Sequence, residues 1–335
     1  MKSFRFRMAL VALLLSLLSP LVSAENYLLR SDVREYLKEL SAQTGIDQNY
    51  LAGLFVKLLP QRDILDAISK PAERTLTWRE YRPIFLTDRR IQEGRSFIVE
   101  NRALLQRASE AYGVSPQIIA AIIGVETFYG RITGKHGVLE SLATLAFDYP
   151  PRAKFFKREL TEFLVLATSE GWPADKVLGS YAGAMGVPQF ISSSYREYAV
   201  DFDGDGKRDL FGSTADVVGS VANYLAVHGW VKNAPVAERW ISGLDDKASV
   251  RALVTKSLKP VHTAQLVTQT GFKSSRINKA TSGNQLVSVM TMNGQKAEEF
   301  WVGYQNFYVI TRYNHSRMYA LAVYQLARAL DRADQ

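Results

Sequence analysis

The chain has 335 residues, a formal net charge of +8 and no cysteine. The lack of cysteine excludes disulfides, a catalytic thiol and a lipid-modified N-terminal cysteine, and a chain of this length can bury a sufficient core without cross-links. The positive charge suits an anionic polymer as partner, but no block of like charges and no basic-aromatic alternation occurs, which argues against nucleic acid.

The first 24 residues have the composition of a secretory signal peptide. Three basic residues precede an apolar run at 8–18, and small residues at 22–24 offer a cleavage site. The alternative is an uncleaved membrane anchor, but the run is short for a bilayer span and is interrupted at Ser19-Pro20. We therefore expect cleavage after Ala24, export to the periplasm, and a soluble mature protein with no membrane span.

Residues 25–112 are predicted to form a helical domain. Apolar residues recur at helical spacing after Ser31, again at 50–58, and in a long third element at 91–105 that ends before Gly113. A last helix, expected from about Arg317 to Asp331 within the C-terminal segment 317–335, is predicted to complete this domain.

Residues 113–245 are predicted to form the core of the molecule. This segment is mostly helical but contains glycine-rich turns at 130–137, 179–186 and 204–212. Loops of this kind, held by a rigid scaffold, commonly line a binding or catalytic site.

The composition shifts after about residue 245. Residues 286–292 favour a strand, Asn293-Gly294 is a strong hairpin-turn signal, and 300–311 is rich in strand-forming residues. Residues 246–311 are therefore expected to form a small β domain inserted late in a helical body. The predicted fold class is α+β, mainly helical.

A glutamate follows a strongly apolar helical segment. Ser115 can cap this helix and Pro116 suits its first position, while isoleucines lie seven, four and three residues before Glu126. That spacing places Glu126 on the buried stripe. Burial raises the pKa of a carboxyl group, as a general acid at neutral pH requires. The simpler alternative is a glutamate that points into water or pairs with Arg131.

Six motifs occur in order across most of the chain: GVETFYG at 124–130, LATLAFDYP at 142–150, SYAGAMG at 180–186, PQF at 188–190, GSVANY at 219–224 and RYNHS at 312–316. Together they resemble the lytic murein transglycosylases of the B type, here in a soluble form without a lipidation cysteine. The resemblance implies a lysozyme-like core, a helical domain and a small β domain, with 312–316 returning to the groove of the core.

The resemblance also implies an activity and a partner. Enzymes of this kind cut peptidoglycan glycan strands between N-acetylmuramic acid and N-acetylglucosamine without adding water, and they leave a 1,6-anhydro ring on the muramyl sugar. Peptidoglycan strands are thus the expected partner. Cell-wall synthases are conceivable further partners that the sequence does not identify.

By the same resemblance, Glu126 is the single catalytic acid and base. Residues of the substrate groove are then Tyr81, Ser180, Met185, Gln189, Tyr224, Tyr313, Asn314 and Tyr319. Tyrosine offers a flat face to sugar rings, and the serine and amide side chains supply donors and acceptors for acetamido groups. Ordinary packing is the alternative for the tyrosines, above all for Tyr224, which shares a helical stripe with Val221 and Leu225.

A two-carboxylate glycosidase would need a second acid facing Glu126. Glu140 and Asp148 are the nearest in sequence; neither lies in a motif that marks a nucleophile, and Asp148 before two prolines favours a turn or cap residue. This pattern fits a substrate-assisted route through the muramyl acetamido group. A hydrolytic muramidase of the same fold and a non-catalytic peptidoglycan-binding protein remain alternatives.

The segment Asp201–Asp209 matches the first half of an EF-hand calcium loop. The matching ligands are the carboxylates of Asp201, Asp203 and Asp205 and the carbonyl of Lys207. The glutamate expected at the last position is Gly212, so the motif is incomplete. The resembled family places a later aspartate there, which makes Asp216 the candidate within a loop at 201–216. Alternatively, Asp216 only favours the dipole of a helix capped by Thr214. We expect structural Ca²⁺ and no organic cofactor.

Overall fold

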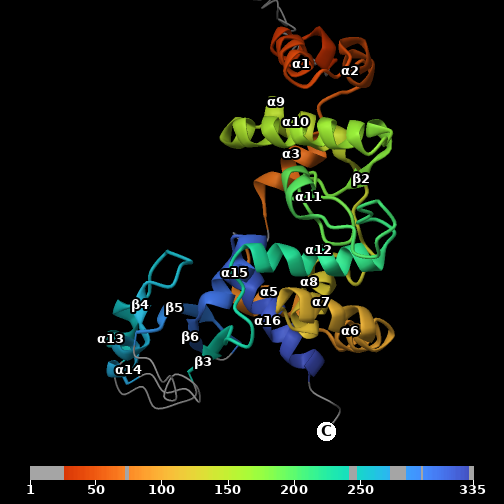
Figure 1. Cartoon of the computed structure of the whole chain (residues 1–335). Helices are drawn as coiled ribbons and strands as arrows, with labels where there is room; N and C mark the ends of the chain where they lie inside the picture. Colours follow the sequence, from red (N-terminus) through yellow and green to blue (C-terminus); the bar gives the residue numbers. More distant parts are fainter. Residues whose placement is uncertain (1–25, 72–74, 241–246, 272–283, 296, 332–335) are drawn as a thin grey trace, which may run out of the picture.

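The computed structural model describes residues 26–71, 75–240, 247–271, 284–295 and 297–331. The predicted signal peptide at 1–24 lies outside these residues. Within the described part of the chain, no helix combines the length and the hydrophobicity that crossing a membrane requires. The molecule is mainly helical with small sheets, as the sequence predicts (Figure 1).

Helices make up the N-terminal part of the described chain. After a short 3₁₀ turn at Tyr27–Leu29, they are α1 (Ser31–Thr44), α2 (Gln48–Phe55), α3 (Arg62–Ser69), α5 (Trp78–Phe85), α6 (Asp88–Glu100) and α7 (Arg102–Tyr112). The predicted long third element is two helices, α6 and α7, that meet at Asn101. Gly45 and Gly113 end α1 and α7 with φ of 75° and 73°, a left-handed conformation that glycine adopts without steric cost.

These helices do not gather in one place. Helices α1 and α2 lie at one end of the molecule beside α9 (Val138–Asp148) and α10 (Ala153–Ser169), whereas α5, α6 and α7 lie near the other end (Figure 1). There α5 and α6 pack against α16 (Arg317–Asp331). The last helix thus begins at the predicted residue, and the predicted domain boundaries stay a prediction.

Helix α8 (Pro116–Thr127) is the central helix of the core. Helices α6, α7, α16 and α12 (Thr214–Val227) pack around it, and every residue from Ile118 to Val125 is buried. The expected buried stripe is therefore wrong in extent, because α8 is covered on all sides and has no solvent face. Pro116 takes the first helical position as predicted, but Ser115 makes no side-chain capping bond.

Two small sheets complete the fold. The β1 (His136–Gly137) and β2 (Leu178–Gly179) strands pair within the core, while the larger antiparallel sheet has the order β3-β6-β5-β4. Its strands are β3 (Ala237–Arg239), β4 (His262–Thr263), β5 (Leu286–Asn293) and β6 (Glu298–Gly303). The predicted strand at 286–292 and its hairpin turn are confirmed, since Gly294 N donates to Ala297 O at 3.0 Å.

The large sheet has its own small core. Short helices α13 (Lys247–Ala252) and α14 (Ala264–Gln269) accompany it, and its buried cluster comprises Trp240, Val250, Ala264, Val267, Val287, Val289, Phe300, Val302 and Tyr304. This cluster is distinct from the main helical core.

The predicted strand at 300–311 is wrong beyond Gly303, because helix α15 (Gln305–Tyr313) follows. The buried side chain of Asn306 explains why: its Oδ1 accepts from Val231 N, and its Nδ2 donates to Val231 O and Ala234 O, at 2.8–3.1 Å. Those bonds fix the first turn of α15 on the preceding loop. Tertiary contacts thus override the strand preference of the β-branched and aromatic residues that follow.

Candidate active site

Glu126 lies in the last turn of α8 and is half-buried. The hydroxyl of Tyr319 on α16 donates a hydrogen bond to Glu126 Oε1 at 2.5 Å, and Tyr319 is only 2% exposed. Burial and the neighbouring negative charge of Glu126 hold the pKa of Tyr319 well above its usual value. Tyr319 therefore stays protonated and acts as a fixed donor to one carboxyl oxygen.

Arg131, the alternative partner of Glu126, has an ion pair elsewhere. Its Nε lies 2.6 Å from Glu93 Oε2, and Glu93 Oε1 also meets Arg89 Nε at 2.9 Å. The structure therefore gives Glu126 a neutral hydroxyl contact and gives Arg131 another carboxylate.

Aromatic rings connect Glu126 to a groove. The ring of Tyr313 lies parallel to that of Tyr319 at 6.4 Å and edge-on to that of Tyr224 at 4.8 Å. The hydroxyls of Tyr313 and Tyr224 donate to Pro188 O and Arg312 O, both at 2.6 Å. Because burial raises the pKa of both phenols, they remain neutral, and their hydroxyls anchor the rings to the backbone.

The groove itself has a volume of about 930 Å³. Its lining includes four of the predicted groove residues, Gln189, Tyr224, Tyr313 and Asn314. Glu126 and Tyr319 are not among the lining residues, but Tyr319, which donates to Glu126, stacks on the lining residue Tyr313. Aromatic walls with a few amide and hydroxyl groups are the lining that sugar rings bearing acetamido groups need.

Two other predicted groove residues, Met185 and Ser180, build the loop beside the groove together with Gln189. Met185 is fully buried and exchanges two backbone hydrogen bonds with Phe190. Ser180 Oγ accepts from Ala182 N and Ala184 N at 3.3 and 3.0 Å. Gln189 has a positive φ of 53°, and its Nε2 donates to two carbonyls at 2.9 Å, which leaves its side-chain oxygen as the acceptor for a ligand.

Tyr81 is not on the surface of the groove. It is 1% exposed in α5, where its ring lies against Trp78 and Phe85. Tyr81 is nevertheless a neighbour of the Glu126–Tyr319 pair, because its electrostatic interaction with Tyr319 contributes to the raised pKa of Tyr319.

Sequence reasoning missed the backbone turn and the packing of Tyr129 that fix the end of α8. Phe128, Tyr129 and Gly130 have successive positive φ angles of 52°, 59° and 85°, so the chain reverses directly after Glu126. The ring of Tyr129 fits against two glycines: a Cβ at Gly94 would lie 2.1 Å from its hydroxyl oxygen, and one at Gly124 would lie 2.6 Å from it. The isolated glycine within the helical pattern of α6 was the available signal.

Of the two nearest following acids, Asp148 is held by partners far from Glu126 in sequence. Asp148 pairs with Arg30 Nη1 at 2.6 Å and accepts the hydroxyl hydrogen of Tyr27, so it ties the N-terminal segment to α9. We expected Asp148 to be a turn or cap residue, but in the structure its side chain forms an ion pair with Arg30. Glu140 lies in the first turn of α9.

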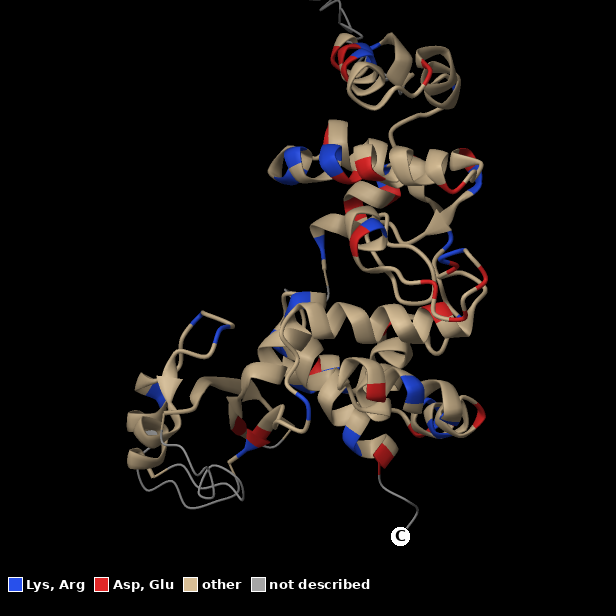
Figure 2. Cartoon of the chain, viewed as in Figure 1, with Lys and Arg blue, Asp and Glu red and all other residues tan. Residues whose placement is uncertain are grey.

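The acidic loop before α12 gathers three carboxylates. Oxygen atoms of Asp201, Asp203 and Asp205 lie within 4.8 Å of one another, and all three residues are exposed. Asp201 accepts from Gly204 N at 2.7 Å and Gly206 N at 2.8 Å, and these glycines have φ of 81° and 89°. Acidic residues gather near the start of α12, which otherwise carries no charged residue along its length (Figure 2). Convergent hard oxygen ligands of this kind fit Ca²⁺.

Asp216 has a different position from the three exposed aspartates. It is 1% exposed, and its two oxygens accept from Phe202 N and Asp209 N, both at 2.7 Å. Its carboxylate thereby clamps both ends of the loop, and burial raises its pKa. The residue at the N-cap of α12 is Ser213 rather than Thr214, and Ser213 also donates to Asp203 at 2.7 Å.

Comparisons with known proteins show the family of the chain. A family model described as a transglycosylase SLT domain matches residues 29–328. The chain is 35% identical over 315 residues to membrane-bound lytic murein transglycosylase B of Escherichia coli (strain K12), which covers 89% of this chain and 82% of that protein.

Solved structures give the same result. The soluble lytic transglycosylase SltB1 of Pseudomonas aeruginosa shares 46% identity and a TM-score of 0.82 over 89% of this chain and 98% of its own. The Escherichia coli lytic transglycosylase Slt35 in complex with calcium shares 35% identity and a TM-score of 0.77 over 89% and 91% of the two chains.

Proposed function

The chain belongs to the family of transglycosylase SLT domain proteins, and we propose that it cleaves peptidoglycan glycan strands as a lytic transglycosylase with Glu126 as acid and base. The observation that carries this proposal is the half-buried Glu126, held by Tyr319, whose ring stacks on Tyr313 in the lining of an aromatic groove. A pure binding protein would gain nothing from a carboxyl group placed there at a cost in desolvation.

The geometry suggests how the two halves of the reaction proceed. Tyr319 donates to Oε1 of Glu126, so the catalytic proton is carried by Oε2. Oε2 protonates the glycosidic oxygen as the bond to the anomeric carbon breaks, and the acetamido oxygen of the muramyl sugar bonds to that carbon. The resulting Glu126 carboxylate then takes the proton of the C6 hydroxyl, whose oxygen displaces the acetamido oxygen and closes the 1,6-anhydro ring.

Export is part of the proposal. The signal-like composition of residues 1–24 supports delivery to the periplasm, where the peptidoglycan substrate is located. The segments 25–112, 113–245 and 246–311 are proposed as the helical, catalytic and β domains.

Digestion of purified sacculi tests whether the protein is an enzyme or a binder. Because cleavage of glycan strands breaks the network, we expect the purified protein to release soluble fragments and to lower the turbidity of the suspension with time. The turnover of many bonds per protein molecule is the required result. Protein that sediments with intact sacculi and releases nothing would support the non-catalytic binding alternative.

We further propose that the loop at 201–209 holds structural Ca²⁺ through Asp201, Asp203, Asp205 and the Lys207 carbonyl, with Asp216 as an additional ligand. Three carboxylates within 4.8 Å repel one another unless a cation neutralises them. The calcium complex of the relative Slt35 supports this assignment. Bound calcium would stiffen the loop that leads into α12. It would thereby help to fix the position of Tyr224, which lies on α12.

Calcium should raise the melting temperature of the protein, because a ligand that binds only the native state stabilises it. The expected gain in unfolding free energy is about 2.7 kcal/mol at a concentration of one hundred times Kd. Asp205→Ala should abolish the gain, whereas Asp175→Ala, which removes an exposed carboxylate elsewhere, should keep it. Melting curves that do not change across millimolar calcium would rule out the site.

A further inference from the structure

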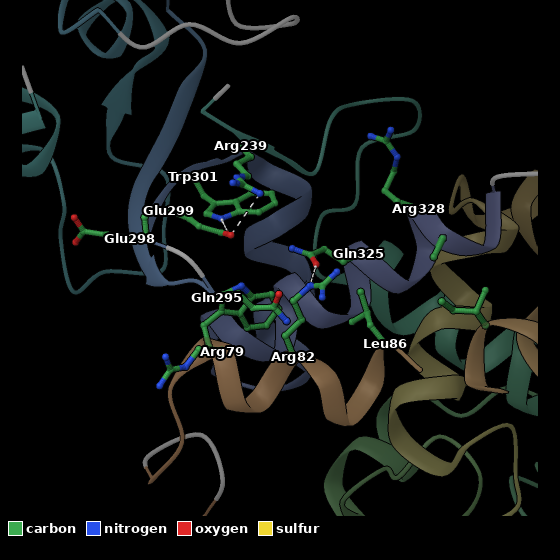
Figure 3. A pocket seen from close by; sticks show the side chains of 14 residues that line it. Arg79, Arg82, Leu86, Arg239, Gln295, Glu298, Glu299, Trp301, Gln325 and Arg328 are labelled. Atoms are coloured by element: carbon green, nitrogen blue, oxygen red, sulfur yellow. Dashed lines mark hydrogen bonds and ion pairs between the residues drawn. The ribbon is translucent and has the colours of Figure 1, made fainter. Parts of the chain in front are cut away.

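A second pocket, of about 600 Å³, shares no lining residue with the groove. It lies between α5, the C-terminal half of α16 and the hairpin of β5 and β6 (Figure 3). Four arginines and two glutamates line it: Arg79, Arg82, Arg239, Arg328, Glu298 and Glu299. The arginines come from three elements that are far apart in sequence, so the fold gathers positive charge at this point.

One end of the pocket already binds a carboxylate, which belongs to the chain itself. Glu299 accepts from Trp301 Nε1 at 3.0 Å and lies 3.4 Å from Arg239 Nη1. Glu298 does not balance the other arginines, because it pairs with Arg251 and points to the side away from Arg82 and Gln325 (Figure 3).

Two of the remaining arginines, Arg82 and Arg328, have neutral partners. Arg82 Nε donates to Gln325 Oε1 at 2.6 Å, and Arg328 Nη1 contacts the Tyr324 hydroxyl at 3.3 Å. Among the described residues, no carboxylate forms an ion pair with either side chain. Gln325 thus orients the guanidinium of Arg82 without neutralising it, and the two terminal nitrogens of Arg82 remain as a fork that suits a planar carboxylate.

The rest of the lining is apolar and small. Leu86, Ile91 and Ala329 contribute aliphatic surface, and the rings of Trp78 and Trp301 are almost fully buried at 2% and 6% exposure. A ligand that fits this lining has short aliphatic groups between its carboxylates. Flat sugar rings would instead need exposed aromatic faces, which the groove offers and this pocket does not.

We propose that this pocket binds an acidic peptide through its carboxylates, and that the occupant is a stem peptide of peptidoglycan. Stem peptides combine alanine residues with several free carboxylates, which matches the arginines and the aliphatic lining. This choice of occupant rests on the proposed function. The pocket would hold the enzyme on the bacterial cell wall through a binding site that is separate from the proposed glycan-binding groove.

Titration with a soluble stem tetrapeptide (L-Ala-γ-D-Glu-meso-diaminopimelate-D-Ala) by calorimetry tests the proposal on the full-length mature protein. We expect the wild type to bind and both Arg82→Gln and Arg328→Glu to raise Kd at least tenfold, because each loses a charge-assisted contact. Binding should also weaken as salt is added. Arg102→Gln, which removes an exposed arginine on α7 outside both pockets, should bind like the wild type.

Two variants are needed because Arg82 also helps to join α5 to α16, whereas Arg328 is exposed. A wild type that does not bind the tetrapeptide, or variants that bind it equally well, would overturn the proposal. Tighter arginine-dependent binding of hexaglutamate would overturn the choice of a stem peptide in favour of an acidic protein segment. Sacculus cleavage by the wild type is measured separately. If the wild type does not cleave sacculi, the proposed function is wrong. If it cleaves sacculi but does not bind the tetrapeptide, only the proposal for this pocket is wrong.

Discussion

Glu126→Gln should lower the rate of peptidoglycan cleavage by at least about 10²–10⁴-fold, the usual contribution of general acid catalysis. Glutamine keeps the shape of the side chain, and its carbonyl oxygen can still accept the hydrogen bond from Tyr319 at the position of Oε1. It cannot donate a proton to a leaving oxygen or remove one from a hydroxyl. The initial rate of fragment release from sacculi measures the effect.

Binding separates this expectation from simple misfolding. The variant should still sediment with sacculi and should keep its melting temperature, because the groove residues and the Tyr313–Tyr319 stack are untouched. Near-normal turnover by Glu126→Gln would show that another group is the acid.

Glu140→Gln is the matched control. Glu140 is the nearest following acid in sequence and is also half-buried, but it lies in the first turn of α9 and the Tyr319 hydroxyl bonds to Glu126 instead. Its loss should leave cleavage within a few-fold of the wild type. A loss as large as that of Glu126→Gln would reveal a second essential carboxyl group and would point to a two-carboxylate hydrolase.

Local signals predicted much of the fold. Pro116 marks the start of α8, the strand-favouring segment 286–292 marks β5, and Asn293-Gly294 marks the hairpin, because each feature depends on residues close in sequence. The acidic loop could be predicted for the same reason, because glycines permit its turns and the three aspartates lie within five residues of one another.

Features set by distant contacts were not predictable from local pattern. The strand-like residues after Tyr304 are helical because Asn306 binds the loop at Val231–Ala234. Likewise, the contact between Glu126 and Tyr319 joins residues 193 positions apart, and no periodicity indicates it. Tyr319 entered the candidate site only through family resemblance, and Gly94 did not enter it at all.

The structure refines the roles of the predicted groove residues. Gln189, Tyr224, Tyr313 and Asn314 line the groove, whereas Met185 is buried beneath it. Sequence motifs mark residues that matter together, but they do not distinguish a side chain that touches the ligand from one that supports the loop around it. That difference depends on burial, which the three-dimensional packing decides.

The chemical form of the product follows from having one well-placed carboxyl group. A hydrolase of the two-carboxylate type uses its second group as a nucleophile or to activate water. Here Asp148 is committed to Arg30 and Tyr27, so the substrate must supply the missing nucleophile in the proposed mechanism. In that proposal the muramyl acetamido oxygen and then the C6 hydroxyl take this role, and Glu126 would serve in both steps.

Mass analysis of the fragments released from purified sacculi tests this central claim most directly. The account predicts fragments that end in 1,6-anhydromuramic acid, each lighter by one water than the corresponding lysozyme-type product and unchanged by borohydride. Fragments with reducing muramic acid ends, which borohydride converts to the alcohol, would contradict the transglycosylase mechanism and would establish a hydrolytic muramidase instead.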